Sequence, residues 1–332
     1  MEEISMASPT ITYNDILPPN SFVTGIRQDG GDGQPVVLSG NYQPTGGGKP
    51  QAMLYRGPLY PTDGNGIFPF LPAFPGQIIV TSTFYGPNTA LFDPSLGQGN
   101  VRAVGSYQYE GGQGDHGMIY QGPLDGSGTW TQIDVPADVA GGTVANTLAH
   151  STMGDLVVGN YDLADKPGSG NGFIYNVKTG TFQVLDIGAL ATLYGIWQNG
   201  PKDPAPYTLA GGYKQGHDLN TGLLADYDPV TGQLSRLTPL SYEGKPGVVT
   251  HFEGISGVPG GYALAATTDA GGAFVYVDRL ADGGFGPARW LAAANPASTS
   301  ISTANSILRN NLVGIYRPAS GGVQSYVATL AD

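Results

Sequence analysis

Two ionisable residues, His251 and Glu253, lie two positions apart in the string HFEGI. On a β-strand such residues point to the same face, with Cα atoms roughly 7 Å apart. An imidazole and a carboxylate at that distance can share a proton or a substrate, as in acid–base catalysis. A hydrogen bond with a purely structural role would leave the same pattern, so the pair predicts either a catalytic site or a structural contact.

The chain contains only four histidines and no cysteine. Glycine-rich loops should place His116 and His217 near His251, whereas His150 is expected at the far end of its strand in a structural role. These histidines and Glu253 could in principle bind zinc, but no local ligand spacing supports a metal site. The sequence also lacks G-x-S-x-G, H-E-x-x-H, P-loop and Rossmann motifs. We therefore expect no metal and no cofactor.

Composition excludes other partners. The net charge of −12 opposes binding to phosphate backbones and to anionic lipid. No apolar run approaches the roughly 20 residues of a membrane helix, and the chain as given shows no export signal. We expect a soluble monomer that binds neither nucleic acid nor membrane. Its localisation stays open, and an extracellular location fits if the chain is a trimmed mature form.

Four short strings recur in a fixed order. The first is an apolar strand that ends in Tyr, as in VVLSGNY, RAVGSY, LVVGNY, TLAGGY and LVGIY, with YALAATT as a copy that lost the Tyr. A second string follows it, for example GMIYQG or AFVYVD, then a third such as TWTQIDVP or TFQVLDIG. A fourth string precedes the first in each repeat: FVTGI, PNTAL, VANTL, TLYGI, HFEGI and TANSI. The lengths, aromatic content and flanking glycines are typical of β-strands.

Four strands repeated six times predict an all-β, six-bladed β-propeller. The last repeat lacks its final strand, and ITYNDILPP near the N-terminus matches that string. We expect residues 11–17 to pair with residues 323–330 and so to close the last blade. Residues 1–10 would form a tail and residues 11–332 a single domain. Two stacked β-sandwiches would not explain the odd strand at the N-terminus.

The succession of WTQIDVP, VVGNY and NGFIY resembles the short repeats of bacterial HAF-type repeat proteins. The similarity extends over the whole chain and is best in the second and third repeats. It implies the propeller fold and no particular activity.

Two repeated positions could form a ligand site where the inner strands begin. One is a ring of channel-lining residues, which could equally well hydrogen-bond to backbone and buried water: Thr24, Asn88, Asn146, Tyr194, Glu253 and Asn305. The other is the set of strand-end tyrosines, which could instead pack between blades: Tyr42, Tyr107, Tyr161, Tyr213 and Tyr316. Tyr combines an apolar ring with a polar tip, which suits hydroxylated ligands.

Three functions follow from these residues. The first is the binding of a small polar ligand, a sugar or hydroxylated metabolite, at the channel mouth. The second is a metal-independent lyase, isomerase or hydrolase that uses His251 and Glu253, with Lys214, Arg309 or Arg317 for electrostatic stabilisation. The third is a structural or protein-interaction propeller.

Overall fold

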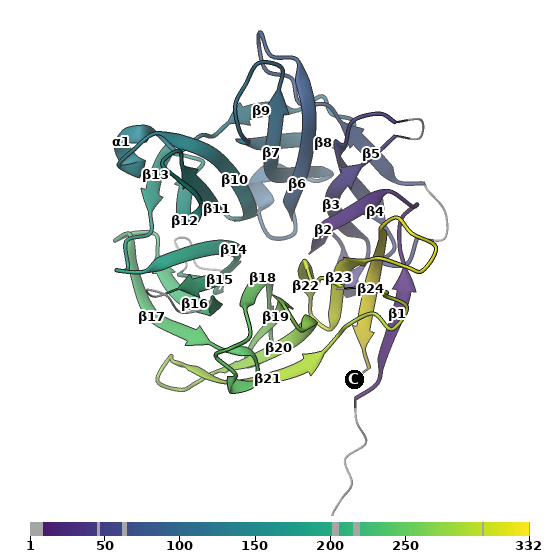
Figure 1. The fold of residues 1–332 in the computed structure, drawn as a ribbon, viewed down its shortest axis with the longest axis vertical. Helices are drawn as coiled ribbons and strands as arrows, with labels where there is room; N and C mark the ends of the chain where they lie inside the picture. Colours follow the sequence, from purple (N-terminus) through teal and green to yellow (C-terminus); the bar gives the residue numbers. More distant parts are fainter. Residues whose placement is uncertain are drawn as a thin grey trace, which may run out of the picture.

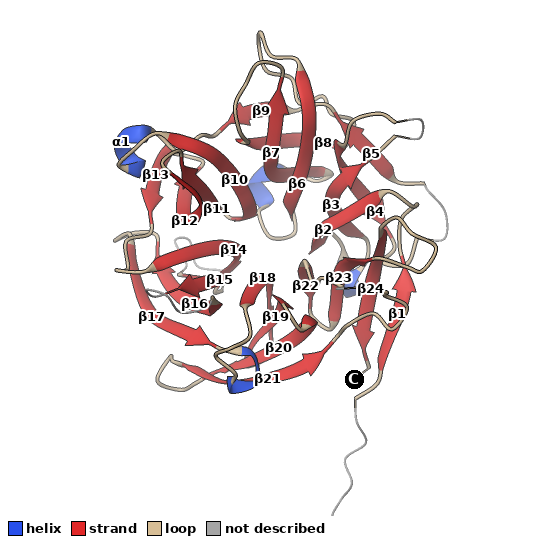
Figure 2. Ribbon diagram, in the orientation of Figure 1, coloured by secondary structure: helices blue, strands red, loops and turns tan. Residues whose placement is uncertain are grey.

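The computed structural model describes residues 9–44, 47–61, 65–200, 206–214, 220–300 and 302–331. Six four-stranded antiparallel sheets stand around a central axis, which confirms the six-bladed propeller (Figure 1). Strands make up nearly all of the regular structure, as the colouring of Figure 2 shows. Among the described residues, no helix is long and apolar enough to cross a membrane.

The first three blades follow one another along the chain, each running from the channel outward. Blade 1 consists of β2 (Ser21–Gln28), β3 (Val36–Tyr42), β4 (Gln51–Gly57) and β5 (Ile67–Phe70). Blade 2 consists of β6 (Ile79–Thr89), β7 (Asn100–Tyr109), β8 (His116–Pro123) and β9 (Thr129–Gln132). Blade 3 consists of β10 (Val144–Met153), β11 (Leu156–Leu163), β12 (Lys166–Asn176) and β13 (Thr181–Val184).

The other three blades complete the ring. Blade 4 consists of β14 (Leu190–Gln198), β15 (Tyr207–Lys214), β16 (Thr221–Asp228) and β17 (Gln233–Leu240). Blade 5 consists of β18 (Thr250–Val258), β19 (Gly261–Thr268), β20 (Gly271–Arg279) and β21 (Phe285–Ala292). Blade 6 consists of β22 (Ser306–Leu308), β23 (Asn311–Tyr316), β24 (Gln324–Leu330) and β1 (Ile11–Asp15). Short helices occur in loops: η1 (Gly31–Gly33), η2 (Pro94–Leu96), α1 (Ala137–Ala140) and η3 (Tyr242–Gly244).

The N-terminal strand closes the ring. β1 pairs antiparallel with β24, from Ile11 opposite Leu330 to Asp15 opposite Tyr326, and the two lie side by side in Figure 1. The predicted closure is confirmed, although β1 ends at Asp15 and the next residues turn inward. Ile16 is 1% exposed and packs with Leu17 between blades 6 and 1. The strand therefore completes a sheet and also fills a blade interface.

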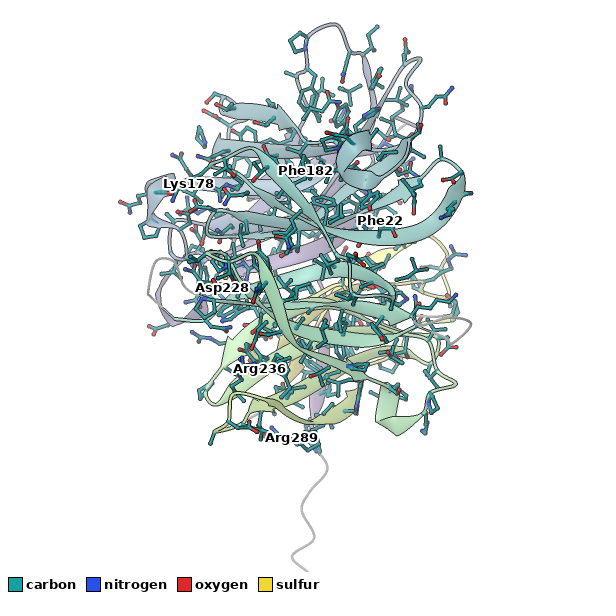
Figure 3. All side chains as sticks on the ribbon, turned by 90° about the vertical axis from the view of Figure 1, so that its left-hand side faces the viewer. Phe22, Lys178, Phe182, Asp228, Arg236 and Arg289 are labelled. Carbon is teal, nitrogen blue, oxygen red and sulfur yellow. The ribbon has the colours of Figure 1, made fainter. Side chains whose placement is uncertain are left out.

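The hydrophobic core is divided among the blade interfaces. Each of the six apolar clusters in the described part of the chain draws its side chains mainly from two adjacent blades. Between blades 1 and 2, for example, Phe70 meets Phe84 and Tyr120 edge-on, with ring centroids 5.4 and 4.8 Å apart. The outer strands carry charged groups instead, and Asp228, Arg236 and Arg289 lie on the outside of blades 4 and 5 in Figure 3. The core thus holds each blade to its two neighbours.

Candidate functional site

The inner strands share one irregularity. Five of them shift register at the same point against their partner strand, which leaves one extra residue unpaired in each: Thr24, Tyr85, His150, Tyr194 and Glu253. In blade 6, Asn305 donates its N–H to the carbonyl of Val313 while the following residue, Ser306, pairs with Val313, so Asn305 holds the same place. A β-bulge re-aims the side chain of its extra residue. Here the five register-shift residues line a narrow cavity in the channel.

A small residue follows each bulged one: Gly25, Gly86, Ser151, Gly195, Gly254 and Ser306. The reason is close approach between neighbouring inner strands. A Cβ atom on Gly86 would lie 2.5 Å from the carbonyl oxygen of His150, and one on Gly254 would lie 2.8 Å from the Cα atom of Ser306. The pattern of a variable residue followed by Gly or Ser therefore marks the channel position in every blade.

This pattern corrects the predicted ring in two blades. Asn88 lies three residues beyond Tyr85 and is completely buried. Asn146 lies four residues before His150, where its carboxamide bonds to the N–H of Asp115 and to the carboxylate of Asp162. Tyr85 and His150 take their places. His150, predicted at the far end of its strand in a structural role, is the seventh of the ten residues of β10 and lines the channel cavity. The small residue after the bulge is the sequence signal that would have found both.

Three of the bulged residues have aromatic side chains, and His150 contacts the other two, Tyr85 and Tyr194. The Tyr85 and His150 centroids are 4.8 Å apart, and those of His150 and Tyr194 are 4.7 Å apart. Burial lowers the pKa of His150 to about 3, so its imidazole is neutral at pH 7. Burial also raises the pKa of Tyr194, and the nearby Glu253 adds to that shift.

Glu253 is the only acidic member of this ring. Burial raises the pKa of its carboxyl group to about 7, and the described residues provide no hydrogen bond or ion pair for it. The cavity that it faces has a volume of about 20 Å³, which is room for about one water molecule. Glu253 can therefore hold or release a proton near neutral pH, but only toward water or a comparably small species.

At the end of the channel where the inner strands turn back, the buried Arg27 guanidinium lies 5.7 Å from the ring centroids of both Phe92 and Trp197. Its Nε also donates to the carbonyl of Pro87, and burial lowers its pKa to about 10. We call this the closed end of the channel, and the end where the inner strands begin the open end.

At that open end lies a polar cavity of about 230 Å³ between blades 3, 4 and 5, which we call the mouth pocket. Its polar side chains are Thr192, Tyr194, Lys214, Asn220 and His251. Tyr194 lines both the mouth pocket and the channel cavity. The mouth pocket thus adjoins the channel, and Lys214 brings a positive charge to it.

His251 is held with one ring nitrogen available. Its Nε2 lies 3.3 Å from the amide nitrogen of Asn220, which donates to it, and this contact leaves the proton on Nδ1. Nδ1 is buried and has no partner among the described residues. Gly212 packs closely against this nitrogen, since a Cβ atom there would lie 3.0 Å from Nδ1. Burial lowers the pKa of His251, so the ring is a neutral hydrogen-bond donor at pH 7.

The structure separates other predicted site residues. No hydrogen bond joins His251 to Glu253, which lines the channel cavity and not the mouth pocket. Arg309 lies at the closed end of the channel, where its guanidinium donates to Gln28 over 3.2 Å. Arg317 is exposed at the end of β23. His217 lies outside the described residues.

His116 belongs to a second pocket at the open end, between blades 2 and 3, with a volume of about 260 Å³. Its Nδ1 is 2.8 Å from a carboxylate oxygen of Asp134, a partner that the sequence did not indicate. Its ring packs against Tyr109, with centroids 5.0 Å apart, and its Nε2 is buried without a partner among the described residues.

The strand-end tyrosines lie mostly in the blade interfaces. Tyr107, Tyr161 and Tyr316 are buried in the apolar clusters, and Tyr42 packs against one of them. Tyr213 is half-buried. Two of the channel-lining residues also hydrogen-bond across blades: Thr24 donates to the carbonyl of Phe84, and Asn305 donates to that of Val23. The placement of the buried tyrosines and of these two residues favours contacts between blades over contact with a ligand.

No group of three or more potential metal ligands occurs in the part of the chain that the structure describes. Nothing in that part therefore adds a metal site to the mouth pocket.

Comparison with known proteins supports the fold. No family model and no curated protein matches this sequence, so the resemblance to HAF-type repeats stays a prediction. A solved structure of a protein of unknown function from Dyadobacter fermentans is similar, with a TM-score of 0.51 at 8% identity, over 97% of this chain and 99% of that one. The periplasmic gluconolactonase of Pseudomonas aeruginosa aligns with a TM-score of 0.47 at 13% identity, over 94% of this chain and 87% of that one. The similarity to the structure from Dyadobacter fermentans concerns the fold alone.

Proposed function

We propose that the protein binds a small, hydroxylated, anionic molecule of about monosaccharide size in the mouth pocket. The observation that carries the proposal is the free Nδ1–H of His251 in a polar cavity that also contains Lys214. A buried donor without a partner is costly, so a ligand that accepts its hydrogen bond gains that energy on binding. Lys214 forms no ion pair with the described residues and can receive a carboxylate.

The size and polarity of the pocket set the ligand class. A volume of about 230 Å³ lies just below the usual range of drug-sized sites, roughly 300–1,000 Å³. Thr192 and Asn220 add hydroxyl and amide groups that suit a ligand with several hydroxyls.

The catalytic alternative, an acid–base pair of His251 and Glu253, has one favourable feature, the pKa of Glu253 near 7. It is less well supported because the two side chains line different cavities. We therefore prefer binding to catalysis.

The proposal is tested with D-glucuronate and D-glucose, two similar rings with and without a carboxylate, by thermal shift and calorimetric titration. We expect glucuronate to bind more tightly than glucose. Lys214→Gln should weaken glucuronate binding about tenfold and leave glucose binding nearly unchanged, since removing one ionic contact costs on the order of 1.5 kcal/mol.

The matched control is Lys49→Gln, which removes the same charge from an exposed lysine of blade 1. An equal loss of glucuronate affinity in both variants would indicate general electrostatic attraction and contradict the proposed site. If His251→Phe binds both sugars as tightly as the wild type does, the proposed hydrogen bond from His251 to the ligand is contradicted.

A further inference from the structure

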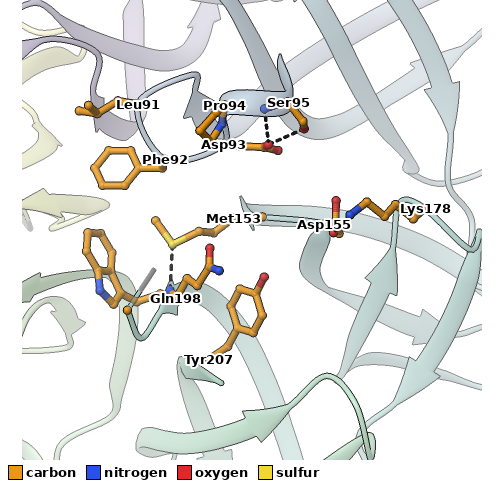
Figure 4. A pocket seen from close by; sticks show the side chains of 13 residues that line it. Leu91, Phe92, Asp93, Pro94, Ser95, Met153, Asp155, Lys178, Gln198 and Tyr207 are labelled. Atoms are coloured by element: carbon orange, nitrogen blue, oxygen red, sulfur yellow. Dashed lines mark hydrogen bonds and ion pairs between the residues drawn. The ribbon is translucent and has the colours of Figure 1, made fainter. Parts of the chain in front are cut away.

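A second cavity lies at the closed end of the channel, opposite the mouth pocket. With a volume of about 600 Å³ it falls within the size range of small-molecule sites. Its walls come from the turns of blades 2, 3 and 4, and we call it the turn-end cavity (Figure 4). The residues important here are Leu91, Phe92, Met153, Trp197, Gln198 and Tyr207.

The wall from blade 2 is a folded loop, residues 90–99 between β6 and β7. Asp93 accepts hydrogen bonds from the backbone N–H and the hydroxyl of Ser95. Its carboxylate also pairs with the buried Arg102, which in turn donates to the carbonyl of Gly154 in blade 3. One buried guanidinium thus fixes the loop against the next blade, so this part of the cavity exists without a ligand.

The wall from blade 4 is held just as firmly. The rings of Phe92 and Trp197 meet edge to face with centroids 5.6 Å apart, and Arg27 contacts both from the channel side. The backbone N–H of Gln198 donates to the sulfur of Met153 over 2.9 Å. Because the parts are already fixed in place, binding would require little ordering of the protein.

The chemistry of the walls is aromatic with one polar edge. Phe92, Trp197 and Tyr207 contribute rings, and Met153 contributes a polarizable thioether that favours contact with aromatic groups. The side-chain amide of Gln198 has no partner among the described residues, so its donors and acceptor are available. Leu91 is 48% exposed and forms an apolar rim of the cavity.

Among the described residues, the charged side chains that line the turn-end cavity already take part in ion pairs. Asp93 pairs with Arg102, and Asp155 pairs with Lys178 at a distance of 2.5 Å. A charged ligand would therefore have to compete with existing ion pairs. From the fixed aromatic walls and the unpaired Gln198 amide, we propose that the turn-end cavity is a second binding site, for an uncharged planar aromatic molecule with a hydrogen-bonding edge.

The test uses 4-methylumbelliferone, a flat fluorescent phenol, at a pH where it is uncharged, and follows its anisotropy in the presence of the full chain. We expect saturable binding of one molecule per chain. Leu91→Asp should weaken it at least tenfold by placing a charge on the apolar rim, and Gln198→Leu should weaken it severalfold at similar side-chain volume. Leu280→Asp is the matched control, since Leu280 is 44% exposed on blade 5.

Three results would overturn the proposal: no saturable binding, equal losses in the Leu91 and Leu280 variants, or displacement of the probe by methyl glucoside at similar concentration. If Leu91→Asp lowers the melting temperature, the test depends on Gln198→Leu instead. Unchanged binding of the probe in Gln198→Leu would contradict the proposed hydrogen bond to the Gln198 amide. Lys214→Gln should leave this binding unchanged, so the two proposed sites fail or succeed separately.

Discussion

The inner strands and the closing strand at the outer edge of blade 6 are built on opposite principles. At the outer edge of blade 6 a strand from the N-terminus pairs in regular register, and a tyrosine hydroxyl anchors it. At the inner edge every strand is interrupted by a bulge, or by its equivalent in blade 6, and the extra residues differ from blade to blade. The regular pairing of β1 with β24 closes the ring. The irregular inner strands place polar and ionisable groups around the small cavity in the channel.

The strongest test of the outer edge is removal of residues 1–18, which deletes β1 together with the buried Ile16 and Leu17. We expect stability to fall by about 5 kcal/mol or more, since losing even one large buried aliphatic side chain costs about 2–5 kcal/mol. The exposed edge of β24 should also promote association between chains. Light scattering after size-exclusion chromatography and thermal melting measure both effects.

A truncation of residues 1–8 keeps all of β1 and serves as the control. A monomeric 1–18 truncation with an unchanged melting temperature would show that the ring does not depend on its closing strand.

The inner edge is tested by Glu253→Gln, whose effect should depend on pH. The folded-state pKa of about 7 lies above the ordinary glutamate value of 4.5, so the folded protein keeps this proton more tightly than the unfolded chain. The contribution of Glu253 to stability is fully present below about pH 4.5 and is lost as the pH rises through 7. The free energy of unfolding of the variant should equal that of the wild type at pH 4. At pH 8 it should exceed the wild-type value by about 3 kcal/mol.

Chemical denaturation at several pH values measures this difference, with the exposed Glu110→Gln as the control. The variant must be compared with the wild type at each pH, because His150 also makes stability depend on pH, in the opposite direction. Its lowered pKa of about 3 means that its contribution is present above pH 6.5 and is lost as the pH falls. A wild-type advantage at pH 8 would contradict the assignment of Glu253 as a buried acid without a partner.

The smallest expected effect concerns the anchor of the closing strand. The hydroxyl of Tyr316 donates to the carboxylate of Asp15 over 2.9 Å, which joins β23 to β1 across β24. Tyr316→Phe should cost about 1.5 kcal/mol, the low end of the range for a hydrogen bond to a charged group. Tyr161→Phe changes a buried ring without a described hydroxyl partner and should be nearly neutral. Equal effects in urea unfolding would mean that the hydroxyl of Tyr316 does not anchor the strand.

Sequence reasoning succeeded where the repeat is regular. Strands that end in tyrosine recur in order, and the unmatched string near Ile11 identified its partner strand because a blade needs four strands. It was less accurate on the inner strands, because a bulge interrupts the alternation from which the inward-facing residue is read. Asn88 and Asn146 looked like the equivalents of Thr24, while Tyr85 and His150 occupy the corresponding positions.

The sequence did not predict the turn-end cavity, for a different reason. Its walls come from three blades, and one of them is the loop of residues 90–99, whereas the inner strands of blades 3, 5 and 6 turn back over two residues. A comparison of repeats shows what blades have in common, so it does not reveal a feature that depends on one blade's loop.

The bulges have a consequence for how this molecule can change over evolution. The extra residue takes no part in strand pairing, whereas the Gly or Ser after it is constrained by the neighbouring strand. A change of side chain at these channel positions therefore leaves strand pairing intact, although Thr24 and Asn305 also hydrogen-bond to the next blade. Mutational drift at Thr24, Tyr85, His150, Tyr194, Glu253 and Asn305 can give related proteins different channel linings on one fold.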